Sequence, residues 1–147
     1  MEVQVKGLDK LLKKLDKLGG SIPQSTQKAL LKGGAVFEKA LKQDPTPKDT
    51  GLLRESMHTE AKDANTVSVG TNVDYAAYVE FGTGLRGDPS VSHTTKRYWK
   101  HKDGSGEWHV FHGQPPQPFM RTAFAENKDK VVDAVKESIR EDVKNLK

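Results

Sequence analysis

The sequence has no cysteine among its 147 residues. This absence excludes disulfide scaffolds, cysteine-ligated zinc and iron–sulfur sites, and thiol nucleophiles. The sequence also has no apolar run approaching the ~20 residues that span a bilayer, and its first residues, MEVQVKGLDK, lack the apolar stretch of a signal peptide. We therefore expect a soluble chain that is not exported by a signal peptide and does not enter a membrane.

The sequence contains few apolar residues, and its net charge is small. Hydrophobic residues make up 34% of the chain and charged residues 30%, so the apolar share lies slightly below that of an average globular domain. The length fits one domain over residues 1–147, whose core must be thin. A thin core suits a subunit that completes its burial against neighbours. The net charge of +4 is mild for a nucleic-acid-binding protein.

The first third of the chain has helical spacing. Leucines recur on one face over residues 8–18 and predict a short amphipathic helix, ended by two glycines. A second helix is predicted from Ser21 to about Lys42. Gly33 and Gly34 interrupt it, which indicates close approach of another backbone, with a local kink as the alternative. The pattern then becomes alternating over residues 52–71 and predicts two antiparallel strands.

The second half combines a loop, a hairpin and a long helix. Residues 75–81 fit a helical turn or a strand, and residues 82–95 are typical of a loop. Residues 97–112 predict a β-hairpin around the four residues 103–106. In simple register Trp99 shares a face with Trp108, which makes that face apolar. A final amphipathic helix of up to about 27 residues follows the prolines at 115, 116 and 118.

Two patterns suggest ligand chemistry but lack the context that it needs. Residues 82–87 (GTGLRG) match the dinucleotide-binding pattern G-x-G-x-x-G, yet no parallel strand pattern surrounds them. Four histidines cluster between residues 93 and 112, but simple register points His101 and His109 to opposite faces of the hairpin. No catalytic constellation can be proposed from spacing. We therefore predict no metal, no cofactor and no enzymatic activity.

Two features remain for a structural or binding role. Glu80 lies between Val79 and Phe81 in an apolar string, so we expect a basic partner, with Arg54 and Arg121 as the candidates. The tryptophans of the hairpin lie among basic residues (Lys96, Arg97, Lys100 and Lys102), and such a surface can stack on single-stranded bases. A small nucleic-acid-binding module is therefore the alternative to an assembly protein.

Three strings in order resemble the tail-completion or head–tail joining proteins of long-tailed phages and prophages, also labelled HK-type neck or minor capsid proteins. PKDTGLLRES at residues 47–56 is similar to the P-x-D-T-G-x-L-R-x-S of that family. YAAYVEFGTG at 75–84 resembles Y-A-x-Y-V-E-F-G-T, and QPFMRTAF at 117–124 resembles P-F-L-R-P-A, with Thr122 where the family commonly has proline. Together with the terminal helices, the resemblance spans nearly the whole chain.

The resemblance implies a tail-terminator-like α+β fold: an antiparallel β-sheet flanked by helices, with a long C-terminal helix and the hairpin as an insertion. It implies a homo-oligomeric ring, hexameric in the family, that completes the tail tube and joins it to the head–tail connector. DNA would pass through the channel without sequence-specific binding. The protein would reside in the neck of the virion, and in the host cytoplasm before assembly.

The residues expected to shape the subunit or its interfaces come from these strings and from the hairpin. Glycines supply permissive backbone, aromatic side chains pack, and Glu80 pairs with an arginine. Whether they serve the core of one subunit or contacts between subunits is left open by the sequence. The full set is Asp49, Gly51, Leu53, Arg54, Tyr75, Tyr78, Glu80, Phe81, Gly82, Pro118, Phe119, Arg121, Trp99 and Trp108.

Overall fold

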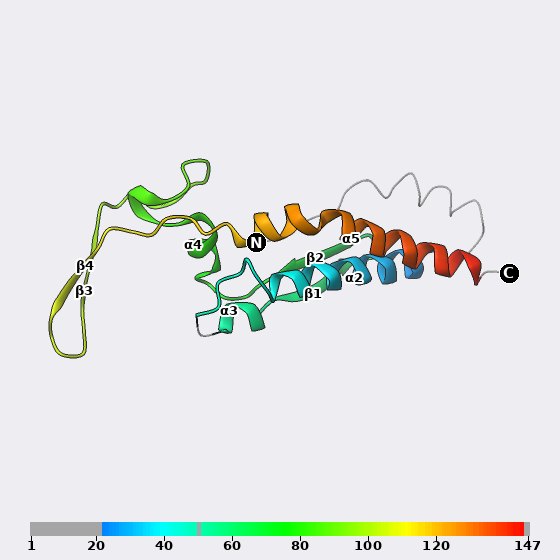
Figure 1. The fold of residues 1–147 in the computed structure, drawn as a ribbon, viewed down its shortest axis with the longest axis horizontal. Helices are drawn as coiled ribbons and strands as arrows, with labels where there is room; N and C mark the ends of the chain where they lie inside the picture. The colour runs from blue at the N-terminus through cyan, green and yellow to red at the C-terminus, as the bar shows by residue number, and fades with distance from the viewer. Residues whose placement is uncertain (1–21, 50, 146–147) are drawn as a thin grey trace.

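The computed structural model describes residues 22–49 and 51–145. The predicted helix over residues 8–18 lies outside them. The described chain forms an elongated body with a slender hairpin at one end (Figure 1). Within these residues the elements comprise helices and two separate two-stranded antiparallel sheets, which confirms the predicted α+β class. No helix of the described ranges combines the length and apolarity needed to cross a membrane.

Two long helices lie side by side and antiparallel along the body (Figure 1). They are α2 (Ile22–Leu41) and α5 (Phe119–Lys144), close to the bounds predicted from their apolar spacing. The Phe37 and Phe124 rings meet edge-on with centroids 5.5 Å apart, and the Lys28 Nζ lies 2.6 Å from Asp142 Oδ1 where the far ends of the helices meet. The apolar stripes of the two helices therefore face each other, as amphipathic helices require.

The paired glycines of α2 let two different neighbours approach. A Cβ on Gly33 would lie 2.6 Å from Val135 Cγ2 of α5, and a Cβ on Gly34 would lie 2.5 Å from Thr59 Cγ2. Successive residues of a helix point about 100° apart, so one glycine faces α5 and the other faces the sheet. The predicted close approach of another backbone is confirmed at Gly33, where a Cβ would lie 3.3 Å from the Val131 carbonyl oxygen, whereas the near neighbours of Gly34 are side chains.

The sheet beside α2 contains β1 (His58–Asp63) and β2 (Thr66–Gly70). They pair antiparallel, with Thr59 opposite Val69. The prediction of two strands over residues 52–71 is therefore confirmed for most of that range, but Leu52–Glu55 forms the short helix α3. Gly51, at φ 82°, begins this helix, and the positive φ explains why the chain turns there instead of extending.

The core lies between α2, α5 and the first sheet. Phe37, Leu41 and Met57 are fully buried within it. The other buried members of the main cluster are Leu53, Val69, Ala76, Phe119, Met120, Ala123 and Val131. The start of α5 and the short helix α4 (Ala76–Phe81) thus both contribute to one core, and α4 resolves the ambiguity over residues 75–81 in favour of a helix.

The chain beyond α4 leaves the body and returns to it. A single 3₁₀ turn, η1 (Gly84–Arg86), precedes an extended stretch, and β3 (Trp99–Lys102) and β4 (Trp108–Phe111) form the predicted hairpin. We call residues 98–112 the arm. It projects away from both long helices (Figure 1), so neither of its faces is covered by them.

The turn of the arm corrects the predicted register. The N–H of Asp103 donates to the carbonyl of Glu107 at 2.9 Å, so the turn spans five residues where four were predicted. Lys102 therefore pairs with Trp108, and Trp99 pairs with Phe111. Because a shift of one residue reverses the facing of a strand, the prediction that Trp99 and Trp108 share a face is wrong.

Candidate interaction surface

The root of the arm is tied to the end of α4 by backbone hydrogen bonds. Thr83 N–H donates to the Gln114 carbonyl at 2.9 Å, and Gln117 N–H donates to the Val79 carbonyl at 2.8 Å. These contacts join the segment that leaves the body to the one that returns. We call residues 79–84 and 113–118 the junction, because the arm meets the body there.

Gly82 makes the crossing of the two segments possible. Its φ is 71° and its ψ −175°, a conformation that is essentially restricted to glycine. A Cβ at this position would lie 2.6 Å from the Gln114 carbonyl oxygen and 2.7 Å from Pro116 N. Gly82 is therefore required both by its own backbone conformation and by the backbone packed against it.

Glu80 is fully buried, with 0% of its surface exposed, and it caps the start of α5. Its Oε2 accepts the Met120 N–H at 2.8 Å, and its Oε1 accepts the Arg121 N–H at 3.2 Å and the Arg121 Nε–H at 3.0 Å. The first N–H groups of a helix have no partner within the helix, and a carboxylate there is favoured by the helix dipole. Arg121 is thus the partner of Glu80, and Arg54 is not.

Arg121 extends this contact to the loop after α4. Its Nη1 lies 2.9 Å from Asp88 Oδ2, and its guanidinium carbon lies 5.2 Å from the centre of the Phe81 ring. Hydrogen bonds from Ser90, together with the Arg121 ion pair, lower the pKa of Asp88 from 3.8 to about 2. Arg121 therefore links α4, α5 and the loop that leads to the arm.

The low pKa of Asp88 makes the stability of this link depend on pH. A carboxylate with a depressed pKa stabilises the fold above its unfolded pKa of about 4, and this contribution is lost as the pH falls toward 2. We expect Asp88→Asn to remove the contribution, so that urea midpoints between pH 4 and pH 2 fall less steeply than in the wild type. The matched control is Asp133→Asn, an exposed position on α5, and a profile for Asp88→Asn parallel to the wild type would contradict the prediction.

The string at residues 47–56 forms a structural corner. Arg54 Nε donates to the Thr46 carbonyl at 2.7 Å, and its Nη2 lies 2.6 Å from Asp44 Oδ1. Leu53 is buried in the core, whereas Asp49 is exposed. Arg54 thus holds the turn after α2 against α3. Because Asp44 is almost fully exposed, the ion pair itself contributes little to stability.

The glycine-rich residues 82–87 do not adopt a nucleotide-binding arrangement. They follow the helix α4 and lead into a 3₁₀ turn of three residues, whereas a dinucleotide site needs a strand before the loop and a long helix after it. Gly84 has φ 64°, and a Cβ there would lie 3.0 Å from the Trp99 ring. These glycines therefore shape the loop, as expected.

The histidines have separate environments. The two ring nitrogens of His93 face carbonyl oxygens: Nδ1 lies 2.7 Å from that of Val91, and Nε2 lies 3.1 Å from that of Gly84. His101 and His109 are cross-strand partners, so the prediction that they point to opposite faces is wrong. His109 Nε2 lies 2.7 Å from Asp103 Oδ2, and potential ligand atoms of Asp103, Glu107 and His109 lie within 4.8 Å of one another.

The hydrogen bonds of Asp103 indicate a role in the turn and not in a metal site. Its Oδ1 accepts the N–H groups of Ser105 and Glu107. This carboxylate stabilises the turn of the arm, as aspartate commonly does.

The arm exposes large apolar side chains on both faces. Trp108 is 63% exposed, Phe111 54% and Val110 50%. The ammonium of Lys102 lies 5.9 Å from the Trp108 ring, and those of Lys96 and Lys100 lie 5.8 Å from the Trp99 and Tyr98 rings. The arm therefore presents exposed aromatic side chains, which are enriched in protein interfaces, beside lysines, which are not.

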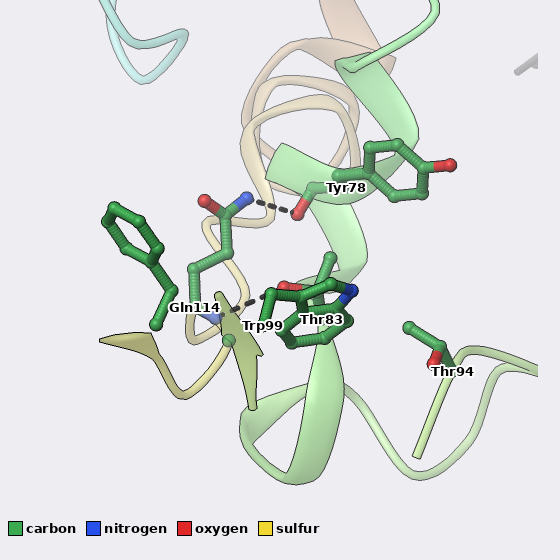
Figure 2. Close-up of a pocket in the computed structure, with 7 residues that line it drawn as sticks. Tyr78, Thr83, Thr94, Trp99 and Gln114 are labelled. Carbon is green, nitrogen blue, oxygen red and sulfur yellow. Dashed lines mark hydrogen bonds between the residues drawn. The ribbon is translucent and has the colours of Figure 1, made fainter. Parts of the chain in front are cut away.

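A groove of about 490 Å³ lies where the arm meets α4. We call it the root groove. Figure 2 shows Gln114 between Tyr78 and Thr83: its side chain donates to the Tyr78 carbonyl at 2.6 Å, and its N–H donates to Thr83 Oγ1 at 3.2 Å. The groove is lined by the aromatic residues Tyr78, Trp99 and Phe111 and by the polar residues Thr83, Thr94 and Gln114.

The other predicted site residues divide between core and surface. Phe119 is buried, Phe81 is partly buried, and Pro118 precedes the first turn of α5. Tyr75 and Tyr78 are instead exposed. Within one subunit the aromatic residues of the string at 75–84 therefore do not pack as a group.

Sequence reasoning missed two members of the junction and one residue of the loop beside it. Asp88, Gly113 and Gln114 were not among the predicted residues, although Gly113 has φ 83° and a Cβ there would lie 2.2 Å from the Thr83 carbonyl oxygen. The Asp-Pro-Ser sequence at 88–90 is a turn signal that could have identified Asp88. A glycine directly before Gln-Pro-Pro could have indicated a crossing backbone at Gly113.

These features define a small α+β protein whose exposed chemistry lies on a projecting arm and in the groove at its root. The HK97-gp10-like family, described as "Bacteriophage HK97-gp10, putative tail-component", matches residues 9–82, half of the chain. The chain therefore belongs to this family of phage tail components. Comparisons with curated proteins and with solved structures find no match.

Proposed function

We propose that this chain is a structural subunit that assembles into a homo-oligomeric ring at the head–tail junction. There the ring completes the tail tube and joins it to the connector, and DNA passes through its channel. The proposed ring is hexameric, its subunit is one domain over residues 1–147, and its role is structural rather than catalytic. Assembly would place the protein in the neck of the virion, after synthesis in the host cytoplasm.

The observation that carries this proposal is the projecting arm. A two-stranded hairpin by itself is marginally stable in water, yet this one extends beyond the body and exposes Trp108, Val110 and Phe111. Such a surface is suited to burial against another protein. In a chain of a tail-component family, neighbouring subunits and tail proteins are the natural partners.

The ring is tested by mass and shape. The purified chain is measured by light scattering and by negative-stain electron microscopy, alone and mixed with the tail-tube protein encoded by the same phage genome. We expect annular particles with the mass of six subunits, in at least one of the two samples. A monodisperse monomer in both samples would contradict the proposal.

A nucleic-acid-binding module is the second candidate, and the cations of the arm and of the residues just before it favour it. Lys96, Lys100 and Lys102 lie beside aromatic rings, and base stacking combined with phosphate contacts is the usual means of binding single strands. This candidate predicts binding of a short oligonucleotide that weakens steeply as salt rises. No binding at low salt would remove it.

A further inference from the structure

We infer that Trp108 at the tip of the arm inserts into the root groove of a second copy of this chain. This inference deepens the proposed ring and rests on it. By the tip we mean Lys102, Trp108 and the turn between them. The contact is heterologous, since the tip of one subunit meets the groove of the next.

The groove and the tip are complementary in size and character. About 490 Å³ is a volume that can enclose a large side chain and part of its strand. The groove offers the Tyr78, Trp99 and Phe111 rings, and pairs of aromatic rings stabilise a contact beyond the area that they bury. Trp108, at 63% exposed, is the tip side chain with the most apolar surface to lose.

The tip cannot reach the groove of its own subunit. Trp108 pairs with Lys102, three residues along the strand from Trp99, which is about 10 Å at 3.3 Å per residue. Trp108 also lies on the opposite face from Trp99 and Phe111, which line the groove. Only another molecule can bring a tip to this groove, and repeated head-to-tail contacts of this kind close into rings.

Unlike charges lie beside parts of the two surfaces, and the Lys96 ammonium also lies 5.8 Å from the Trp99 ring of the groove. Lys100 and Lys102 share the face of Trp108, and neither forms an ion pair with a carboxylate within residues 22–49 and 51–145. Asp74 is exposed and lies one turn before Tyr78 at the start of α4, and it too has no ion pair in this part of the chain. Docking would bring these unlike charges together.

The absence of cysteine from the sequence gives a direct test by disulfide trapping. One variant carries Lys102→Cys at the tip, and a second carries Thr94→Cys at the groove. We expect the oxidised mixture to yield a disulfide-linked dimer on a non-reducing gel, and each variant alone to yield at least tenfold less. Dimers from Lys102→Cys alone would show tip-to-tip contact and overturn the inference.

A second substitution tests the role of the indole. Adding Trp108→Ser to the tip variant should reduce trapping at least tenfold, whereas adding Leu31→Ser should leave it unchanged. Leu31 is a partly exposed apolar residue of α2, away from the arm. Both substitutions affect exposed side chains, and circular dichroism confirms that each variant folds. Unchanged trapping in the Trp108→Ser variant would show that the tip meets the groove without the indole, and would overturn the inference that Trp108 inserts there.

The double variant Lys102→Cys/Thr94→Cys separates this inference from the proposed ring. A ladder of linked species up to the full ring supports both. A ladder that ends at the dimer supports the tip–groove contact and contradicts the ring. Rings seen by microscopy without any trapping contradict the contact alone, and a monomer without trapping contradicts both.

Discussion

Replacing Gly82 with alanine is expected to lower the free energy of unfolding by about 3–5 kcal/mol. A backbone conformation restricted to glycine costs about 1–3 kcal/mol in another residue, and forced overpacking costs a similar amount. The three heavy atoms nearest to the added Cβ are all backbone atoms, those of Gln114, Pro115 and Pro116. Backbone cannot rotate away as a side chain can, so the junction must open.

The effect is measured by urea unfolding, with hydrogen exchange as a local readout. The Thr83 and Gln117 amides, which donate across the junction, should lose protection before the α2–α5 pair does. Gly104→Ala is the matched control, since a Cβ there meets nothing within 4 Å, and its midpoint should stay near that of the wild type. Equal midpoints for the two variants would show that the crossing segments separate freely, and would contradict the prediction.

The sequence predicted where the helices and strands lie better than it predicted on which face of the arm each side chain lies. The apolar spacing located α2 and α5, and the glycines at 33 and 34 correctly indicated close neighbours, because both signals depend on local geometry. The facing of the arm depends on whether its turn contains four or five residues, and the hydrogen bond between Asp103 and Glu107 decides this. Hairpin loops of four and of five residues both occur in proteins, so composition alone could not choose between them.

The candidate surface was predictable only in part, for a similar reason. An acid in an apolar string requires a partner, so Glu80 could be identified as unusual. The choice of Arg121 over Arg54 depends on how the start of α5 packs beside α4, a contact between residues 40 apart in the sequence. The root groove combines α4, the extended loop and both strands of the arm, and no sequence pattern spans these segments.

Replacing Glu80 with alanine is expected to lower the free energy of unfolding by about 2–4 kcal/mol. The Met120 and Arg121 N–H groups would lose their acceptor, and a buried donor without a partner costs about 1–3 kcal/mol. Loss of a helix N-cap typically costs about 1 kcal/mol. Glu80 connects two strings that resemble tail-completion proteins, so the variant should also weaken assembly, as judged by light scattering.

The Glu80→Gln variant and a surface control show which property of Glu80 matters. Glutamine keeps one carbonyl oxygen for the Met120 N–H but directs an NH₂ group toward the other donors, so its stability should lie between that of wild type and that of Glu80→Ala. Glu126→Ala removes an exposed acid of α5 and should change stability by less than about 0.5 kcal/mol. If Glu80→Ala matched Glu126→Ala in both unfolding and assembly, the carboxylate would not be the cap of α5. If both Glu80 variants were equally unstable, the charge at the start of α5 would matter more than the hydrogen-bond acceptors, since both variants lack the charge and only glutamine keeps an acceptor.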